Sequence, residues 1–189
     1  DRLRSRGLGD VYKRQIQFAS EAFDGMCRKG AGEPAVLHSM EAAVIAGTLT
    51  EDQEVLAAAA LHDTVEDAEV ELAEIERQFG ARVAALVESE TENKRKEMPP
   101  EKSWRIRKEE ALEKLKASSD PGVKILYLGD KLSNLRSLYR MQVRQGDGMW
   151  EIFHEKNPEA HHWYYRAVAE ILTAVSYTHL RAHETGAYL

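Results

Sequence analysis

Apolar residues recur along this chain at the three- and four-residue spacing that places them on one face of an α-helix. The alternation of apolar and polar residues that marks a β-strand nowhere reaches a useful length, and no segment repeats another. We therefore expect one all-α domain, folded as a compact multi-helix bundle. A first helix is expected to end over residues 16–23, and further helices to cover 36–49, 50–63, 72–79, 81–90, 102–116, 123–139 and 159–172.

Capping and turn residues set the limits of these helices. The sequence Thr-Glu-Asp-Gln at 50–53 has the form of a capping box that opens a helix. Gly80 separates two short helices, and the pairs Asp-Pro at 120–121 and Asn-Pro at 157–158 each combine an N-cap with a proline in the first turn. The glycine-rich segment 25–34 and the charged segment 93–100 are expected to be loops.

The two ends of the chain encode one DNA word on opposite strands. Residues 10–15 back-translate to GATGTGTATAAGAGACAG, and residues 175–180 back-translate to GTCTCTTATACACATCTC, most of which is the reverse complement. A sequencing adapter on both ends of a fragment produces this relation. We therefore expect residues 1–15 and 174–189 to be translated adapter, and we assign the domain to residues 16–173. The alternative for the first end is a basic arm that binds nucleic acid or directs targeting.

The charge of the domain disfavours a nucleic-acid polymer as partner. Residues 16–173 keep 20 of the 26 basic and 29 of the 32 acidic residues, which gives a net charge of −9. Binding to DNA or RNA requires many cationic side chains against the phosphates, whereas one small phosphorylated ligand needs only a local basic pocket. Cys27 is the one cysteine, which fits a reducing cytoplasm. No apolar run approaches the roughly 20 residues that span a membrane.

One predicted helix runs from small apolar residues into a cluster of ionisable ones. Four alanines and a leucine at 57–61 indicate a helix that is buried on most sides. They are followed by His62, Asp63, Glu66 and Asp67, which form two pairs at the i, i+4 spacing and share a helical face if the turn continues. Burying such groups without partners is costly, so we expect them to face one another or a cation.

A second helix and a separate histidine complete a candidate metal site. In the segment 123–136, Asp130 and Asn134 share one face of an otherwise largely apolar helix, and His38 lies in the first turns of the helix 36–49. Each residue alone is more often an ordinary surface or core residue, but the joint pattern over three helices indicates a metal site. Two histidines and two aspartates suit Mn²⁺, Fe²⁺, Zn²⁺ or a similar ion, and mixed imidazole and carboxylate ligation favours a site that activates water.

Other polar and aromatic residues are expected to serve the surface or the packing of the fold. This prediction covers His154, His161 and His162, and also Trp104, Trp150 and the Trp-Tyr-Tyr run at 163–165. The basic residues at 94–96 and at 105–108 are expected to form a solvated face, although one of them has the reach to contact a ligand phosphate.

These motifs resemble those of the HD superfamily of metal-dependent phosphohydrolases, and in particular the hydrolase domain of RelA/SpoT proteins and the stand-alone small alarmone hydrolases. The matching set is the Arg-Lys pair at 28–29, His38, the run His-Asp-x-x-Glu-Asp at 62–67, the Phe-Gly pair at 79–80 and the run Gly-Asp-Lys-Leu-x-Asn-Leu-Arg at 129–136. The resemblance covers most of residues 18–140, and it implies the all-α HD-domain bundle. The tail at 150–165 resembles that of bacterial stand-alone HD proteins.

The resemblance also implies a role for each matching residue. Four would bind one Mn²⁺: His38, His62, Asp63 and Asp130. Two would position and activate the attacking water: Glu66 and Asp67. Five would contact the substrate: Arg28, Lys29, Lys131, Asn134 and Arg136. The implied enzyme is a phosphoric-ester hydrolase that removes the 3′-pyrophosphate of guanosine 3′,5′-bis(diphosphate), (p)ppGpp, to give GDP or GTP.

The loop before the first ligand departs from the family pattern. The family usually reads His-x-Gly-Gln-x-Arg-Lys there, whereas this chain reads Phe-Asp-Gly-Met-Cys-Arg-Lys at 23–29. The family also has Pro-Tyr before its first ligand and Pro after it, and this chain has Pro-Ala-Val-Leu-His-Ser at 34–39. Two alternatives therefore stay open. One is an HD phosphohydrolase that acts on another nucleotide, such as a nucleoside phosphate or an NADPH-like dinucleotide, and the other is a non-catalytic, nucleotide-sensing helical module.

Overall fold

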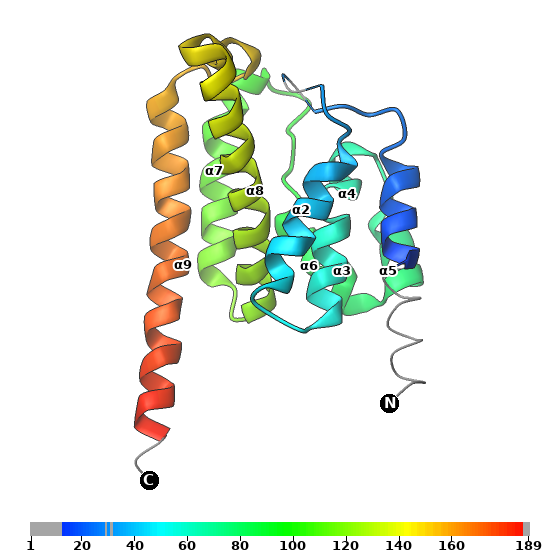
Figure 1. Cartoon of the computed structure of the whole chain (residues 1–189), viewed down its shortest axis with the longest axis vertical. Helices are drawn as coiled ribbons and strands as arrows, with labels where there is room; N and C mark the ends of the chain where they lie inside the picture. The colour runs from blue at the N-terminus through cyan, green and yellow to red at the C-terminus, as the bar shows by residue number, and fades with distance from the viewer. Residues whose placement is uncertain (1–12, 29, 31, 187–189) are drawn as a thin grey trace.

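The structure is a computed structural model that describes the backbone of residues 13–186 except positions 29 and 31, and side chains as far as residue 173. It consists of helices joined by loops, as predicted (Figure 1). A helix over residues 13–22 precedes α2 (Val36–Gly47), α3 (Gln53–Leu61), α4 (Thr64–Asp67), α5 (Leu72–Phe79) and α6 (Ala81–Glu90). These are followed by α7 (Pro100–Ala117), α8 (Pro121–Gln145), the 3-10 helix η1 (Gly146–Ile152) and α9 (Pro158–Gly186).

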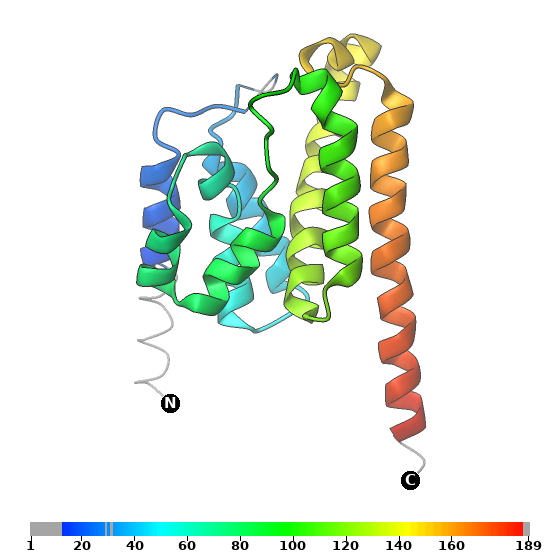
Figure 2. The same ribbon diagram turned by 180° about the vertical axis from the view of Figure 1, so that it is seen from behind.

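The long helix α8 lies between two groups of helices. α2, α3 and α6 pack against one side of it, and α7 and α9 pack on the other, as both views show (Figures 1 and 2). The loop after the helix at 13–22, the loop after α6 and the segment after α8 all lie at one end of the bundle. An antiparallel β-bridge between Cys27 and Pro34 closes the first of these loops. Across the part of the chain that the structure describes, no helix combines the length and apolarity needed to cross a bilayer.

The alanine run of α3 forms the centre of the core, which confirms the prediction of a helix buried on most sides. Residues 57–61 are each at most 4% exposed. Leu86 of α6, Leu115 of α7 and Leu126 of α8 pack in the same cluster. Small side chains let neighbouring helices approach α3 closely, so the residues that end α3 come within reach of those helices.

The start of α3 differs from the predicted capping box. Asp52 is the N-cap, and its Oδ1 accepts hydrogen bonds from the backbone N–H groups of Glu54 (3.0 Å) and Val55 (3.4 Å). The Thr50 hydroxyl accepts instead from the N–H of Asp52 (3.1 Å), outside the helix. A carboxylate is the better cap here, because its charge also complements the positive end of the helix dipole.

Two helices run past their predicted limits. α8 continues to Gln145 because residues 140–145 contain no helix breaker, and Gly146, with φ of 61°, ends it. α9 continues beyond residue 172 to Gly186. The helix at 13–22 also begins before residue 16. A helical conformation does not show whether a segment comes from natural sequence or from translated adapter. The domain limits at 16 and 173 therefore stay a prediction.

Candidate metal centre

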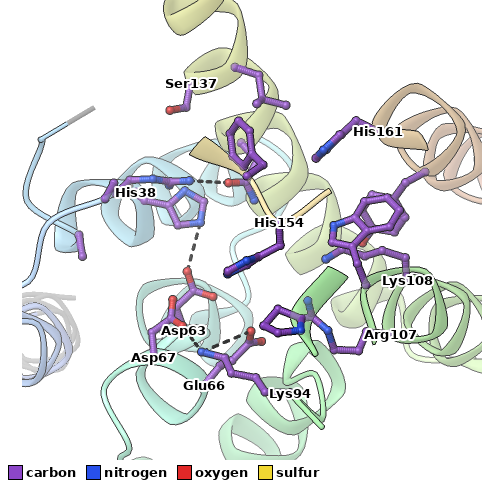
Figure 3. Close-up of a pocket in the computed structure, with 18 of the residues that line it drawn as sticks. His38, Asp63, Glu66, Asp67, Lys94, Arg107, Lys108, Ser137, His154 and His161 are labelled. Carbon is purple, nitrogen blue, oxygen red and sulfur yellow. Dashed lines mark hydrogen bonds and ion pairs between the residues drawn. The ribbon is translucent and has the colours of Figure 1, made fainter. Parts of the chain in front are cut away.

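The structure brings together the four residues predicted as metal ligands, although they come from three separate parts of the chain. The Nε2 atoms of His38, on α2, and His62, at the end of α3, are 3.2 Å apart. Oδ1 of Asp130, on α8, lies 2.9 Å from Nε2 of His38 and 3.5 Å from Nε2 of His62. The carboxylate of Asp63 lies 3.4 Å and 3.2 Å from the same two nitrogens. Figure 3 shows the contact of His38 with Asp63.

The close approach of α2 to α8 places His38 beside Asp130. Gly129 faces the backbone of α2, where a Cβ atom would lie only 2.7 Å from the carbonyl oxygen of Ala42. A side chain at position 129 would therefore hold the two helices apart. With glycine at position 129, the next residue, Asp130, comes within 2.9 Å of His38.

The hydrogen-bond partners of Nδ1 decide which nitrogen carries the hydrogen in each neutral imidazole. Nδ1 of His62 lies 2.9 Å from the carbonyl oxygen of Ala59, which only accepts, so Nδ1 carries the hydrogen. Nδ1 of His38 lies 2.9 Å from the Ser133 hydroxyl, and that hydroxyl donates its own hydrogen to Glu41 (2.7 Å). Ser133 therefore accepts from Nδ1 of His38. Both neutral rings present an unprotonated Nε2 to the space between them.

This set of atoms fits a divalent cation. Two nitrogen lone pairs 3.2 Å apart, faced by two carboxylates, repel one another unless a proton or a metal ion lies among them. Ligands bonded to one cation at about 2.0–2.3 Å and about 90° apart lie about 3 Å from each other. The spacings found here run from 2.9 to 3.5 Å. The two histidines and two aspartates are thus suitable to hold one divalent metal ion.

The ionisation of these groups follows from the same clustering. Burial would lower the pKa of His62, but the charges of Asp63 and Asp130 raise it well above its usual range. Burial would raise the pKa of Asp63, but His62 and His38 bring it to about 2. Lys131 and the two imidazoles likewise overcome burial and hold the pKa of Asp130 well below its usual range. Without metal, a proton on His62 therefore takes the position that a cation would fill.

Glu66 and Asp67 lie beside the cluster in different environments. Glu66 is partly buried, and burial together with the charges of Asp63 and Glu92 raises its pKa to about 7. The backbone N–H of Glu92 donates to Oε2 of Glu66 (3.1 Å). Asp67 is more exposed and forms an ion pair with Lys94, whose ammonium also lies 3.9 Å from Glu66. An acid with a pKa near neutrality is suited to accept a proton from water.

Arg28, Asn134 and Lys131, which were predicted to contact the substrate, lie next to the cluster. Arg28 donates to the side-chain oxygen of Asn134 (2.7 Å), and the Asn134 amide donates to Oδ1 of Asp130 (2.6 Å). Lys131 forms ion pairs with Asp130 and Glu90, and little of its side chain is exposed. Asn134 thus links the basic loop residue Arg28 to the candidate metal ligand Asp130.

Arg136 does not lie at the cluster. Residues 134 and 136 are about 200° apart around an α-helix, so Arg136 points away from Asn134. Its guanidinium donates to Glu41 (3.1 Å), and it does not line the adjoining cavity. Lys29 lies outside the described residues, so its predicted substrate contact stays a prediction.

A cavity of about 780 Å³ opens beside the four clustered residues. His38, Asp63, Glu66 and Asp67 line one part of it. Its wall also carries the basic residues Arg28, Lys94, Lys96, Arg107, Lys108 and Lys131. A volume of this order is typical of pockets for molecules the size of a nucleotide.

Several of these basic residues were expected to form a solvated face. Arg107 and Lys108 are instead only 13% and 19% exposed, because both bond to the buried carboxylate of Glu92 (3.0 and 2.6 Å). Arg105 does lie on the outside, where its guanidinium is 3.3 Å from the ring centre of Trp163. The prediction was therefore wrong for two residues, since their partner lies 15 and 16 positions away in a loop.

A family model and curated relatives match this chain. Residues 16–153 match the model described as HD domain. A protein of Aquifex aeolicus (strain VF5) named guanosine-3′,5′-bis(diphosphate) 3′-pyrophosphohydrolase is 36% identical over 130 residues, which are 69% of this chain and 18% of the relative. A human protein of that name, MESH1, is 46% identical over 86 residues, which are 46% of this chain and 44% of the relative. The chain spans less than half the length of either relative.

Two solved structures share the fold. The crystal structure of a protein from Listeria monocytogenes EGD-e superposes with a TM-score of 0.62 and 32% identity, covering 71% of this chain and 82% of that one. A structure described as a metazoan ortholog of SpoT that hydrolyzes ppGpp superposes with a TM-score of 0.64 and 26% identity, covering 86% and 85%. These likenesses confirm the predicted all-α bundle.

Proposed function

This chain belongs to the HD domain family, and from that premise we propose that it is a metal-dependent hydrolase of (p)ppGpp that releases pyrophosphate and leaves GDP or GTP. The observation that carries the proposal is the convergence of two imidazoles and two carboxylates beside a cavity with a basic wall. The names of the relatives and of the SpoT-like structure support the choice of substrate.

We assign four residues as ligands of one divalent ion: His38, His62, Asp63 and Asp130. Mn²⁺ is our choice among the ions that suit mixed imidazole and carboxylate ligation, and a cytoplasmic site of action stays a prediction. A divalent cation held there would supply Lewis-acid chemistry, because it makes water more acidic and draws electron density from a phosphoryl group.

Glu66 is proposed to accept the proton of the attacking water. Its pKa of about 7 leaves a useful fraction ionised near neutral pH, and a base of that strength is effective there. The N–H of Glu92 fixes one carboxylate oxygen of Glu66. Asp67 is proposed to hold Lys94 at the edge of the site through their ion pair, which keeps a cation within 3.9 Å of Glu66.

The basic residues are proposed to hold the phosphates. Arg28 and Lys131 lie on the side of Asp130, and Arg107 and Lys108 lie across the cavity. Two diphosphate groups on one nucleoside need cations at two separated positions, and the wall offers both. Fixed positive charge also stabilises the phosphoryl oxygens as charge develops on them.

The altered loop favours a second substrate class. Phe23 and Met26, which stand where the family pattern has His and Gln, line the cavity together with Cys27 and Arg28. A change in this part of the cavity wall alters the space for a nucleobase, but it leaves the four candidate metal ligands in place. Another nucleotide, such as a nucleoside phosphate or NADPH, is therefore the second candidate.

A phosphate-release assay tests the proposal. The chain is supplied with Mn²⁺ and offered ppGpp beside other nucleoside phosphates and NADPH, with EDTA as the control. We expect pyrophosphate and GDP from ppGpp, with turnover lost in EDTA. Turnover confined to another nucleotide would replace the substrate and keep the site. Metal binding without any turnover would instead support the sensing module.

A further inference from the structure

The histidines at 154, 161 and 162 take three different places in the structure. His161 is buried (8% exposed) on α9, and His162 next to it is 59% exposed and bonds only to the surface residues Glu159 and Arg166 among its recorded contacts. His154 lies in the segment between η1 and α9 and lines the cavity, as Figure 3 shows. His154 and His161, which the sequence assigned to surface or packing, therefore both line the cavity, and His154 does so from a loop.

The helix η1, which precedes the segment that carries His154, packs against the loop that follows Arg28. At Gly30, whose φ is 76°, a Cβ atom would lie 2.1 Å from Cδ1 of Ile152. The side-chain amide of Gln145 donates to the carbonyl oxygen of Gly30 (3.5 Å). The loop that carries Arg28 thus contacts η1, which ends two residues before His154.

His161 holds both neighbours of His154. Its Nε2–H donates to the carbonyl oxygen of Glu155 (2.8 Å), and its ring packs against Phe153 with centres 5.5 Å apart. Burial lowers the pKa of His161, so this ring stays neutral near pH 7 and can keep one hydrogen for that bond. Figure 3 shows that the side chain of His154 projects away from His161 and into the cavity.

The imidazole of His154 lies between the two charged sides of the cavity. In Figure 3 it projects into the space that separates His38 and Asp63 from Arg107 and Lys108. Six basic and three acidic side chains line this cavity apart from the histidines, so the wall favours an anion even before a metal ion is bound. A ligand that reaches from the candidate metal ligands to Arg107 must pass His154.

We propose that His154 is a substrate-contacting residue that donates a hydrogen bond from its ring to a phosphoryl oxygen of the bound nucleotide. The segment between η1 and α9 is then part of the active site rather than a connection. The choice of a nucleotide rests on the proposed function, whereas the contact with a phosphoryl group rests on the position of the ring and the charge of the wall.

The test compares His154→Ala with His162→Ala, a matched removal of a nearby surface histidine. In the Mn²⁺-loaded chain, His154→Ala is expected to lower kcat/KM for ppGpp by about 10- to 100-fold, the usual effect of losing a hydrogen bond to a charged group. His154→Gln keeps an N–H donor and should recover part of the loss. The Kd for Mn²⁺ and the melting temperature should match wild type in all three variants. A loss of Mn²⁺ binding in His154→Ala would overturn the proposal, since the residue would then serve the metal site or the fold.

A second readout separates this inference from the proposed function. Side-chain ¹H–¹⁵N spectra of the chain with diamagnetic Mg²⁺ are recorded while inorganic phosphate is added. The His154 signals, assigned from their absence in His154→Ala, should shift, and the His162 signals should not. If ppGpp is not turned over but His154 responds to phosphate, the substrate is wrong and the inference stands. If His154 does not respond and His154→Ala behaves like His162→Ala, the inference fails.

Discussion

At the scale of single residues, the two histidines of the candidate metal centre are oriented by partners of different kinds. A backbone carbonyl of α3 holds His62, so the helix itself sets that ring. His38 depends on Ser133, which in turn donates to Glu41. Burial would raise the pKa of Glu41, but hydrogen bonds from Ser133 and Arg136 lower it, so this carboxylate is ionised. A negative charge behind the serine makes His38 the stronger electron donor.

The hydrogen bonds from His38 to Ser133 and from Ser133 to Glu41 form a relay, and its removal should weaken metal binding. We expect Ser133→Ala and Glu41→Gln each to raise the Kd for Mn²⁺ by about tenfold or more, as losses of such outer partners usually do. Titration calorimetry measures this directly. Ser39→Ala is the control, because Ser39 is also buried but its hydroxyl has no hydrogen-bond partner. Equal affinities for all four proteins would show that the relay does not serve the metal.

Glu66 links the candidate chemistry to stability. Its pKa in the folded chain is about 7, above the ordinary 4.5, because of burial first and then the nearby carboxylates. Between those two pH values the folded chain binds this proton more tightly than the unfolded chain does. Stability from this group is therefore highest below pH 4.5 and falls as the pH rises toward 7.

In EDTA, we expect Glu66→Gln to gain stability over wild type as the pH rises, by up to about 3 kcal/mol. A neutral amide has no proton to lose, so only the wild type bears the cost of a buried charge. Urea unfolding of both proteins at about pH 5 and about pH 8 gives the difference in unfolding free energy between variant and wild type at each pH. Parallel changes in both proteins would mean that Glu66 titrates at its ordinary value.

The sequence predicted the clustered residues better than their partners. His62 and Asp63 follow a run of alanines, and Asp130 interrupts an apolar helix, so their cost of burial is visible in the sequence. Ser133 and Glu41 carry no such signal, because a serine and a glutamate on a helix are ordinary surface residues. Their roles arise only when α2 and α8 meet.

At the scale of elements, the contact of α2 with α8 decides whether the centre forms. His38 and Asp130 sit on these two helices, and at Gly129 a Cβ atom would lie only 2.7 Å from the carbonyl oxygen of Ala42 on α2. A small residue at a helix crossing sets the distance between the axes, and in a tight crossing each added atom must push a backbone aside.

Gly129→Ala should therefore cost about 1–3 kcal/mol of unfolding free energy and weaken Mn²⁺ binding. Gly47→Ala is the matched control, since it also changes a helical glycine, but its Cβ atom would meet only Leu56 at 3.8 Å. That variant should be neutral or more stable, because alanine favours a helix. Thermal unfolding and metal titration of both proteins give the comparison. Equal stability in the two variants would refute the idea that this crossing is tight.

Most helices were predicted close to their observed limits, and the exceptions have local causes. α5 and α6 meet at Gly80 with φ of 96°, as the sequence indicated. The N-cap of α3 was misplaced because Thr50 and Asp52 both have capping side chains, and only the folded chain shows which one lies at the helix start. The 3-10 helix η1 was not predicted, since two glycines among its seven residues mask any helical pattern.

At the scale of the whole molecule, the four clustered residues join three regions that are far apart in the chain. A cation bound to them would act only on the folded state, because the unfolded chain does not hold them together. Bound metal should thus support the packing of α2 and α8 on the end of α3.

We expect Mn²⁺ at a hundredfold excess over its Kd to add about 2.7 kcal/mol to the free energy of unfolding. The melting temperature should rise with Mn²⁺ and fall again with EDTA. Asp63→Ala should stay folded, lose this response and lose activity, because one ligand is gone while the core is untouched. Full activity in Asp63→Ala would refute the assignment of the site.

The bundle could be predicted from periodicity, but the cavity could not. Helical spacing and capping depend on residues that are close together in the chain, so they can be identified from the sequence. The wall of the cavity combines the loop at 23–28, the stretch 94–108 and residues 153–165, and no local pattern links these segments. His154 illustrates this, because the residue after it is held by a hydrogen bond from His161, which lies on another element.

The basic wall of the cavity has a consequence for how the molecule meets its ligand in solution. The whole chain carries a net charge of −6, so an approaching polyanion is repelled at long range and attracted only close to the cavity. Salt screens the distant repulsion over about 8–10 Å and affects the enclosed attraction much less. Moderate ionic strength would therefore speed the capture of the ligand, whereas it slows the proteins that bind nucleic acid through a basic surface. We therefore expect the negative outer field to oppose the approach of a long polyanion more than that of a small one that can enter the cavity.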